Sequence, residues 1–312
     1  QRARATGIPG ILLVACLCAV QACSSSGSDM RCAPADTAPA ATSAAISSAL
    51  EEIKNRFKLD GIIFGAEQNG EPLVRTALGA STSGVPASTD MHFRIGAVGW
   101  QVLTTVLLRL TEQADPPIAL NDPASRWFAE YPHAEQATVR MLAASSAGFG
   151  DYITPDAFIA ALTADPFRTW SADDLMAYSV APFQVPQFDH PGQDWQYSHT
   201  DFVALGAILE KVSGRPYAAL LAEHVTGPLR LADTRLQLDT RPQQPVLHTR
   251  QDGDLRDSTD WNPSFVSWAA VTSNICDLGA WNRAFGTGSL LPPAFKNATT
   301  APVNAGRQRR PV

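Results

Sequence analysis

The stretch FRIGAVGWQVLTT, residues 93–105, opens the most apolar helix that the sequence predicts. Residues 97–112 carry apolar side chains almost all round, which is typical of a helix buried inside a domain. Its first turn holds Ala97 and Trp100, one turn apart on one face. Neither side chain can act as a nucleophile or a base, because a methyl group cannot attack a carbonyl carbon and an indole cannot accept a proton at neutral pH. The stretch therefore predicts a core helix whose N-terminal end lacks reactive chemistry.

A helix and a hairpin are expected before this stretch. Apolar residues recur at helical spacing from residue 46 to residue 57 and predict a helix with one apolar stripe, made of Ile46, Leu50, Ile53 and Phe57. The segments GIIFGAEQ and EPLVRTALG follow, separated by Asn69-Gly70. Asn-Gly favours the positive φ angles of a type I′ turn, so residues 61–79 are predicted to form a β-hairpin.

Three helices after this stretch have recognisable end signals. Ser171 with Asp174 resembles a capping box and predicts a helix to about residue 179. The segment TDFVALGAILEKVSG ends in Gly214, a helix stop. Ser273 is expected to cap a last long helix that carries Trp281 and Phe285.

The N-terminus has the composition of a targeting segment. Two arginines precede the short apolar run ILLVACLCAV, so residues 1–22 are predicted to be a signal peptide. The run ends in VQAC before small polar residues, which predicts lipidation of Cys23; LVAC at Cys16 is the alternative, and a cleaved, secreted protein is another. Residues 23–42, rich in Ser, Ala, Pro and Thr, are expected to tether the lipid anchor to the domain at 43–312.

Composition limits the classes of partner. The net charge of −6 argues against nucleic acid as a partner. Two cysteines, Cys32 and Cys276, lie beyond the targeting segment, in a compartment where a disulfide is allowed, but the sequence leaves their pairing open. The histidines are scattered without a close ligand pair, so no metal site and no cofactor are expected.

Several segments, taken in order, carry a family resemblance. Residues 93–105 resemble the region around the S-x-x-K motif of serine β-lactamases and D,D-peptidases. RMLAASSAGFGDY resembles the loop that the family writes as HLLTHTSG, GQDWQYSHTDFVALGAILEKVSG resembles the Y-x-N segment, and VTSNICDLGAWNRAF resembles a later helix. The resemblance covers roughly residues 45–303, and it is closest to the class C and esterase-like branch. It implies an α+β fold: an antiparallel sheet flanked by helices, plus a helical lobe at about 97–225.

The resemblance also assigns the site positions. The nucleophilic serine corresponds to Ala97 and the lysine to Trp100, so the central chemistry is missing. Tyr197 matches the tyrosine that acts as acid or base, whereas His199 takes the asparagine position. Both are candidates for binding a polar ligand, or they merely hydrogen-bond to neighbours. No Lys, His or Arg precedes a Ser-Gly or Thr-Gly pair, so the family's third motif is absent. Because residues 304–312 have no strand pattern, we expect that the C-terminal strands are missing.

Three interpretations of function follow. The first is a pseudoenzyme of the penicillin-binding-protein type, lipid-anchored on the outer face of a bacterial cytoplasmic membrane, which at most binds a peptide or cell-wall fragment. The second is an active serine hydrolase that uses Ser145 or Ser146 as a replacement nucleophile with His199 as base. The third is the non-functional product of a truncated gene. A protein partner is also possible at the open edge of the sheet.

Overall fold

The computed structural model describes residues 32–113, 117–180, 190–249 and 257–296, and the backbone of 308–309. The predicted signal peptide, Cys16 and Cys23 lie outside these residues. Among the described residues, no helix has the length and apolar content that crossing a membrane requires.

The predicted hairpin is present. Strand β2 (Gly61–Gln68) pairs antiparallel with β3 (Glu71–Thr82). The two residues between them, Asn69 and Gly70, have φ angles of 54° and 87°, as a type I′ turn requires. Two short strands, β1 (Ala35–Asp36) and β4 (Val85–Pro86), add to β3, and the order β1-β3-β2 leaves β2 at the edge of this sheet.

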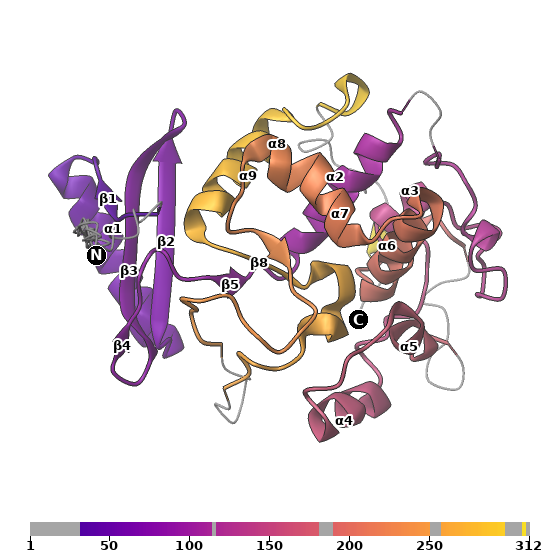
Figure 1. Ribbon diagram of the computed structural model, residues 1–312, viewed down its shortest axis with the longest axis horizontal. Helices are drawn as coiled ribbons and strands as arrows, with labels where there is room; N and C mark the ends of the chain where they lie inside the picture. Colours follow the sequence, from indigo (N-terminus) through magenta and orange to yellow (C-terminus); the bar gives the residue numbers. More distant parts are fainter. Residues whose placement is uncertain (1–31, 114–116, 181–189, 250–256, 297–307, 310–312) are drawn as a thin grey trace, which may run out of the picture. The chain divides into compact units, whose positions relative to one another are not determined.

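Two helices cover this sheet. Helix α1 (Ala40–Phe57) and helix α9 (Ile275–Thr287) lie on opposite sides of the hairpin (Figure 1). Helix α9 reaches the strand at Gly65, where an added Cβ would lie 2.9 Å from Ile275. The predicted stripe of α1 is only partly buried: Leu50 is buried, but Phe57 is 61% exposed. The helical spacing correctly predicted a helix, but fewer residues of its apolar stripe are buried than expected.

The predicted tether is ordered from Cys32 onward. Strand β1 lies within it, α1 begins at Ala40, and Thr37 donates its backbone N–H to Leu73. Cys32 forms a disulfide with Cys276 at the start of α9, so the pairing that the sequence left open does occur. A flexible tether is therefore wrong for the described residues 32–42, which are bound to the domain by strand pairing and by a covalent bond.

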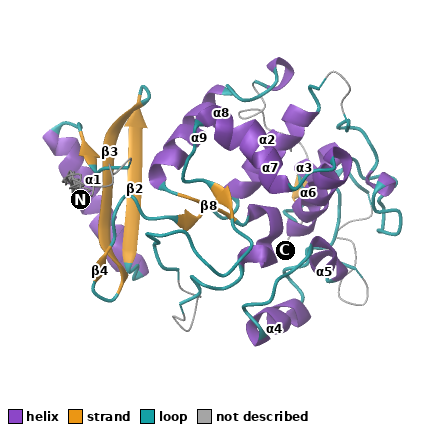
Figure 2. Ribbon diagram, in the orientation of Figure 1, coloured by secondary structure: helices purple, strands orange, loops and turns teal. Residues whose placement is uncertain are grey.

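The helical part is built around α2 (Val98–Leu110) and α6 (His199–Ser213) (Figure 2). Residues Leu103, Val106 and Leu107 of α2 are fully buried, as predicted for an apolar helix. The other helices are α3 (Val139–Ala143), α4 (Asp156–Ala164), α5 (Ala172–Ala177), α7 (Tyr217–Leu221) and α8 (Gly227–Leu229), with a π turn at Ala222–Thr226 and 3₁₀ turns at Ala124–Arg126, Pro263–Ala269 and Pro293–Phe295. Apart from the turn at Pro293–Phe295, these elements contribute to one apolar core.

Helix ends follow local sequence chemistry, with one exception. The Ser171–Asp174 capping box is present, and Gly214 ends α6 in the left-handed conformation. The cap of α9 is Asn274, not Ser273 as predicted: its side chain accepts from the backbone N–H groups of Cys276 and Asp277. Ser273 is instead the last residue of a strand, at residues 271–273. Strand pairing fixes its backbone, so the capping position falls on the next residue.

Two further small sheets complete the fold. Strands β5 (Phe93–Arg94), β8 (Val271–Ser273) and β7 (Arg235–Leu236) pair antiparallel in the order β5-β8-β7. Strand β6 (Asp194–Trp195) pairs parallel with β9 (Gln308–Arg309). The expectation that residues 304–312 have no strand is therefore wrong for 308–309. Helices and antiparallel sheets together make the predicted α+β class.

Candidate functional site

The site begins where β5 runs into α2. Gly96 has a φ of 55°, a left-handed conformation that favours glycine and turns the chain into the helix. Ala97 is the N-cap residue of α2 and provides no side-chain cap. The backbone N–H of Trp100 donates to the carbonyl of Ala97 at 3.1 Å, so the two residues lie one turn apart as predicted.

Trp100 fills the place beside Ala97. Its side chain is buried, and its indole ring stacks on Phe202 of α6 with 4.9 Å between ring centroids and 9° between planes. The indole Nε1–H donates to the hydroxyl oxygen of Tyr197 at 2.6 Å. Trp100 therefore belongs to the core and also holds a polar group of the site in position.

Tyr197 is a neutral phenol that remains accessible. It is 40% exposed, and burial of the rest raises its pKa above the usual value. The indole of Trp100 opposes this rise in pKa, whereas the negative charge of Asp151 adds to it. Since Trp100 occupies the oxygen as an acceptor, the hydroxyl hydrogen of Tyr197 is left to donate.

His199 is held by a carboxylate that sequence analysis did not single out. Its Nδ1 lies 3.0 Å and 3.2 Å from the two oxygens of Asp151, and its backbone N–H also donates to Asp151 at 3.2 Å. A carboxylate accepts, so Nδ1 carries the hydrogen and Nε2 of the neutral ring has a lone pair. The only signal for this pair was the Asp-Tyr that ends the quoted loop at residues 151–152.

The two serines of that loop have a structural part. Ser145 and Ser146 are buried, and Ser145 has a φ of 50°. Their backbone carbonyls accept from Gln196 at 3.0 Å and from Gly192 at 2.8 Å. None of the hydrogen bonds found among the described residues joins either hydroxyl to His199. The backbone of these serines holds the segment that carries Tyr197.

A buried carboxyl lies behind the Asp151–His199 pair. Asp201, in the first turn of α6, is fully buried, and neither of its oxygens has a hydrogen-bond partner in the described part of the chain. Burial raises its pKa well above the usual range. The nearby backbone of Ala147, which is not in hydrogen-bond geometry, opposes this rise in the pKa of Asp201. The negative charge of Asp151 adds to the rise.

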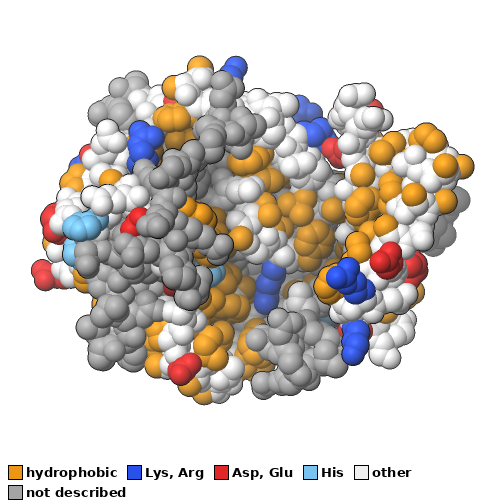
Figure 3. Space-filling model, turned by 180° about the vertical axis from the view of Figure 1, so that it is seen from behind, with side chains coloured by type: hydrophobic (Ala, Val, Ile, Leu, Met, Phe, Trp, Pro, Cys, Tyr) orange, Lys and Arg blue, Asp and Glu red, His pale blue; other side chains and the backbone are white. Residues whose placement is uncertain are grey.

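A cavity of about 360 Å³ runs along α2 from Ala97 to Leu108. Hydrophobic side chains are also prominent on the face of the molecule shown in Figure 3. The described lining residues are mostly apolar and none is charged: Ala97, Trp100, Gln101, Thr104, Thr105, Leu108, Ala143, Tyr197, Phe202, Phe285 and Leu291. Tyr197 places its phenol in this lining. The described residues include no group of three or more ligands able to hold a metal ion.

The fold and these positions identify a class of protein. The family model for Beta-lactamase matches residues 47–311, so the chain belongs to the Beta-lactamase family. It is 26% identical over 208 residues to "Esterase EstB" of Burkholderia gladioli, covering 62% of this chain and 51% of that protein. It is 23% identical over 198 residues to "Penicillin-binding protein 4*" of Bacillus subtilis, covering 61% and 41%. The chain thus spans about half the length of the curated relatives that it matches.

Solved structures give the same fold. A D-stereospecific amidohydrolase from Streptomyces sp. matches with a TM-score of 0.69 and 28% identity, covering 78% of this chain and 72% of that chain. The D-amino acid amidase from Ochrobactrum anthropi SV3, complexed with L-phenylalanine, matches with a TM-score of 0.71 and 24% identity, covering 82% and 72%. The relatives include an esterase, an amidohydrolase and an amidase, and the predicted serine β-lactamase and D,D-peptidase family is confirmed.

Proposed function

We propose that this chain is a pseudoenzyme of the Beta-lactamase family that binds a ligand beside Ala97 without being acylated. The observation that carries the proposal is the pair Ala97 and Trp100. A methyl group stands at the position that the family resemblance gives to the nucleophile. The indole of Trp100, stacked on Phe202, fills the position given to the base.

The remaining polar groups support binding more than turnover. The oxygen of Tyr197 already accepts from Trp100, and its raised pKa disfavours the phenolate that a general base would need. The phenol hydrogen is available to a ligand oxygen. Tyr197 is therefore suited to orient a ligand carbonyl.

The cavity supports an uncharged ligand or the apolar end of a peptide. No charged side chain is found among its described lining residues, so a ligand carboxylate would lose water without gaining an ion pair. Apolar walls with one phenol donor suit an aryl or alkyl group that carries a carbonyl. A cell-wall peptide would have to place such a part here and keep its charged groups in water.

An active serine hydrolase is the second candidate, and the Asp151–His199 pair favours it. A carboxylate that fixes the imidazole tautomer is what a general base needs. Against it, neither Ser145 nor Ser146 makes a hydrogen bond to His199 among the described contacts. A product of a truncated gene without function is the third candidate, and it would bind nothing.

Acylation and binding experiments separate the three. We expect no mass increase after incubation of intact protein with benzylpenicillin, p-nitrophenyl acetate or a fluorophosphonate. We expect methyl phenylacetate to raise the melting temperature and quench tryptophan fluorescence, and the phenylacetate anion to do neither. An acyl or phosphonyl adduct on a serine would establish the hydrolase, and no binding by any probe would favour the non-functional product.

A matched pair of variants locates the binding. Thr104 and Thr163 each donate a hydroxyl to the carbonyl four residues earlier, but only Thr104 lines the cavity. Thr104→Phe should fill the cavity and weaken methyl phenylacetate binding at least tenfold, whereas Thr163→Phe should leave it unchanged. Equal effects of the two variants would place the ligand elsewhere.

We also propose that a lipid at Cys23 holds the domain on the outer face of the cytoplasmic membrane. The basic start, the apolar run and the small residues around this cysteine motivate the proposal. In a bacterial host, the protein should partition into detergent, and Cys23→Ala should leave it unprocessed or release it. An effect of Cys16→Ala without one of Cys23→Ala would move the lipid to Cys16.

A further inference from the structure

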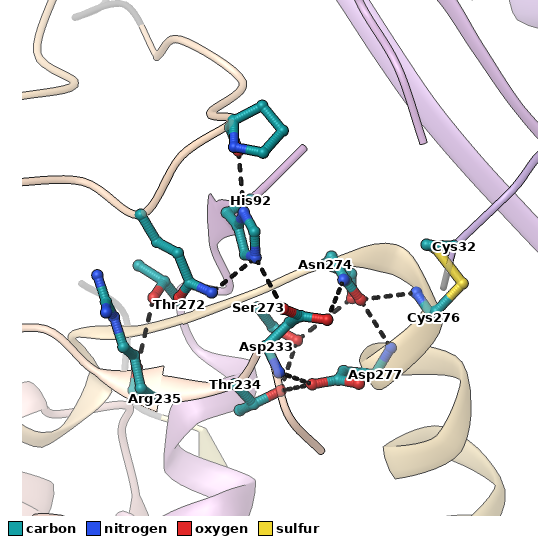
Figure 4. Close-up of polar contacts among 12 residues, drawn as sticks. Cys32, His92, Asp233, Thr234, Arg235, Thr272, Ser273, Asn274, Cys276 and Asp277 are labelled. Carbon is teal, nitrogen blue, oxygen red and sulfur yellow. Dashed lines mark hydrogen bonds and ion pairs between the residues drawn. A yellow bond between two sulfur atoms is a disulfide. The ribbon is translucent and has the colours of Figure 1, made fainter. Parts of the chain in front are cut away.

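A buried histidine joins three segments of the chain just before the site. His92 precedes β5 and lies five residues before Ala97. Its side chain is buried, and Figure 4 shows it above the carboxylate of Asp233. Backbone hydrogen bonds also join His92 to Pro245 and Leu247, at 2.7 Å and 2.8 Å. The hydrogen bonds of the His92 ring therefore help to hold β5, the strand that leads into α2, in position.

The contacts of the His92 ring determine the protonation of one of its two nitrogens. Nδ1 lies 2.9 Å from the carbonyl oxygen of Pro245. A carbonyl only accepts, so Nδ1 carries a hydrogen in every protonation state that keeps this contact. The question is then whether Nε2 carries a second hydrogen.

The two neighbours of Nε2 require opposite protonation states of this nitrogen. The side-chain nitrogen of Gln243 lies 2.7 Å away and can only donate, so it requires a lone pair on Nε2. The carboxylate of Asp233 lies 3.4 Å away and can only accept, so it requires a hydrogen on Nε2. No single protonation state satisfies both neighbours in these orientations. With the neutral ring, a carboxylate faces a lone pair.

The carboxamide of Gln243 can resolve this conflict by turning over. Its oxygen Oε1 is buried and has no hydrogen-bond partner in the part of the chain that the structure describes. The oxygen and nitrogen of a carboxamide have nearly the same size, so a half-turn exchanges them without altering the packing. After the half-turn, Oε1 accepts from a protonated Nε2, and Asp233 faces a hydrogen instead of a lone pair.

Other acidic groups also face this ring. Asp233 accepts from the amide of Asn274 at 3.0 Å, and Asp277 of α9 accepts from the backbone of Asp233 at 2.8 Å (Figure 4). Burial raises the pKa of Asp277; hydrogen bonds from Thr234 and Asp233 oppose the rise, the charge of Asp233 adds to it, and His92 opposes it. Asp233 thus contacts the ring directly, and Asp277 interacts with its charge.

We propose that His92 and Gln243 form a proton-linked switch. The neutral ring accepts a hydrogen bond from the Gln243 amide. When Nε2 takes up a proton from solvent, the carboxamide turns over, and the ring donates to Gln243, Asp233 and Pro245 together. Histidine is the side chain whose charge ordinarily changes near neutral pH. The switch thus fastens the start of β5 to residues 233 and 243 more strongly in acid.

Nitrogen NMR of the ¹⁵N-labelled full chain tests the switch. From about pH 8 to pH 5, Nδ1 of His92 should stay protonated, Nε2 should gain a proton, and the side-chain NH₂ signals of Gln243 should shift with the same midpoint. A ring with hydrogen on Nε2 alone at pH 8 would overturn the proposal. So would Gln243 signals that stay constant while His92 titrates.

Two glutamine variants provide a matched comparison. Gln243→Glu can only accept, so the midpoint of His92 should move to higher pH than in the wild type, as a nearby opposite charge causes. Gln237 is also buried with an unpartnered Oε1, but no hydrogen bond between it and His92 is found in the described part of the chain. Gln237→Glu should give a much smaller shift, and equal shifts would refute the contact. The wild-type titration decides the matter even if neither variant folds.

Discussion

Restoring the two missing groups should not restore catalysis. The double variant Ala97→Ser with Trp100→Lys would place a hydroxyl and an ammonium one turn apart, as the Trp100-to-Ala97 backbone hydrogen bond shows. However, no described residue of the cavity lining is positively charged and able to hold a substrate carboxylate. The variant would restore the nucleophile and the base, whose loss costs about a millionfold in turnover in a serine hydrolase, but not the group that holds the substrate. We therefore expect nitrocefin hydrolysis at the background rate.

The same variant should be less stable. Trp100 is 4% exposed and stacks on Phe202, and removal of a buried tryptophan side chain costs about 3–5 kcal/mol. A domain of this size has about 5–15 kcal/mol in total, so the double variant should remain folded but with a melting temperature lower by roughly 6–20 °C. Trp100→Phe keeps an aromatic ring and loses the indole donor to Tyr197, so its loss should be smaller.

Three measurements check this prediction: nitrocefin turnover, intact mass after incubation with benzylpenicillin, and thermal unfolding. Ala97→Ser alone is the control for the hydroxyl, because it leaves the packing of Trp100 unchanged. Nitrocefin turnover above background in a folded double variant would refute the reasoning. It would mean that a substrate carboxylate needs no partner in this cavity.

Three further predictions concern the fold. Replacing both Cys32 and Cys276 by Ser frees a loop closed over 244 residues, so urea unfolding should show a loss of about 2–5 kcal/mol, with about 5.5 kcal/mol as the chain-entropy limit; an unchanged midpoint would contradict this. Asp201→Asn should stabilise the domain at pH 8 relative to acid pH. Burial raises the pKa of Asp201 in the folded state, so the stability of the wild type falls as the pH rises above the pKa of this group in the unfolded chain. The matched variant Asp156→Asn, at an exposed first-turn residue, should not stabilise the domain in this way. In hydrogen exchange, the edge strand β2 should exchange faster than α2 and residues 202–212; a protected β2 would mean that its edge is covered.

Local sequence chemistry predicted the elements well. The Asn69-Gly70 turn, the Ser171–Asp174 cap and the stop at Gly214 each depend on a few adjacent residues, and all are present. The nearly continuous apolar character of α2 likewise predicted its burial. The cap of α9 was wrong by one residue because Ser273 and Asn274 are both good caps, and only strand pairing of Ser273 decides between them.

Contacts between distant residues could not be predicted in the same way. Asp151 and His199 are 48 residues apart, and Cys32 and Cys276 are 244 apart. Nothing in either local sequence specifies the partner, since each pair forms only after the helices and strands have packed. The exposure of Phe57 has the same origin: helical spacing places it on the stripe, but contacts with distant parts of the chain decide whether it is buried.

The polar groups of the site favour the binding proposal for a reason of their own. An active site keeps a nucleophile, a base and an oxyanion donor open to the substrate, at a cost in stability. Here the oxygen of Tyr197 already accepts from Trp100, and no hydrogen bond among the described residues joins a serine hydroxyl to His199. What remains open to the cavity is the phenol hydrogen of Tyr197 and the side chain of Gln101, among mostly apolar walls. A site of this kind can select a ligand by shape and by a hydrogen bond from Tyr197, and the alanine at the nucleophile position, Ala97, costs such a site nothing. The Tyr197→Phe variant tests this directly: it should weaken methyl phenylacetate binding by about 0.5–1.5 kcal/mol, the net worth of one hydrogen bond, and leave toluene binding unchanged. Equal losses for both probes would mean that the phenol shapes the cavity and does not recognise the carbonyl.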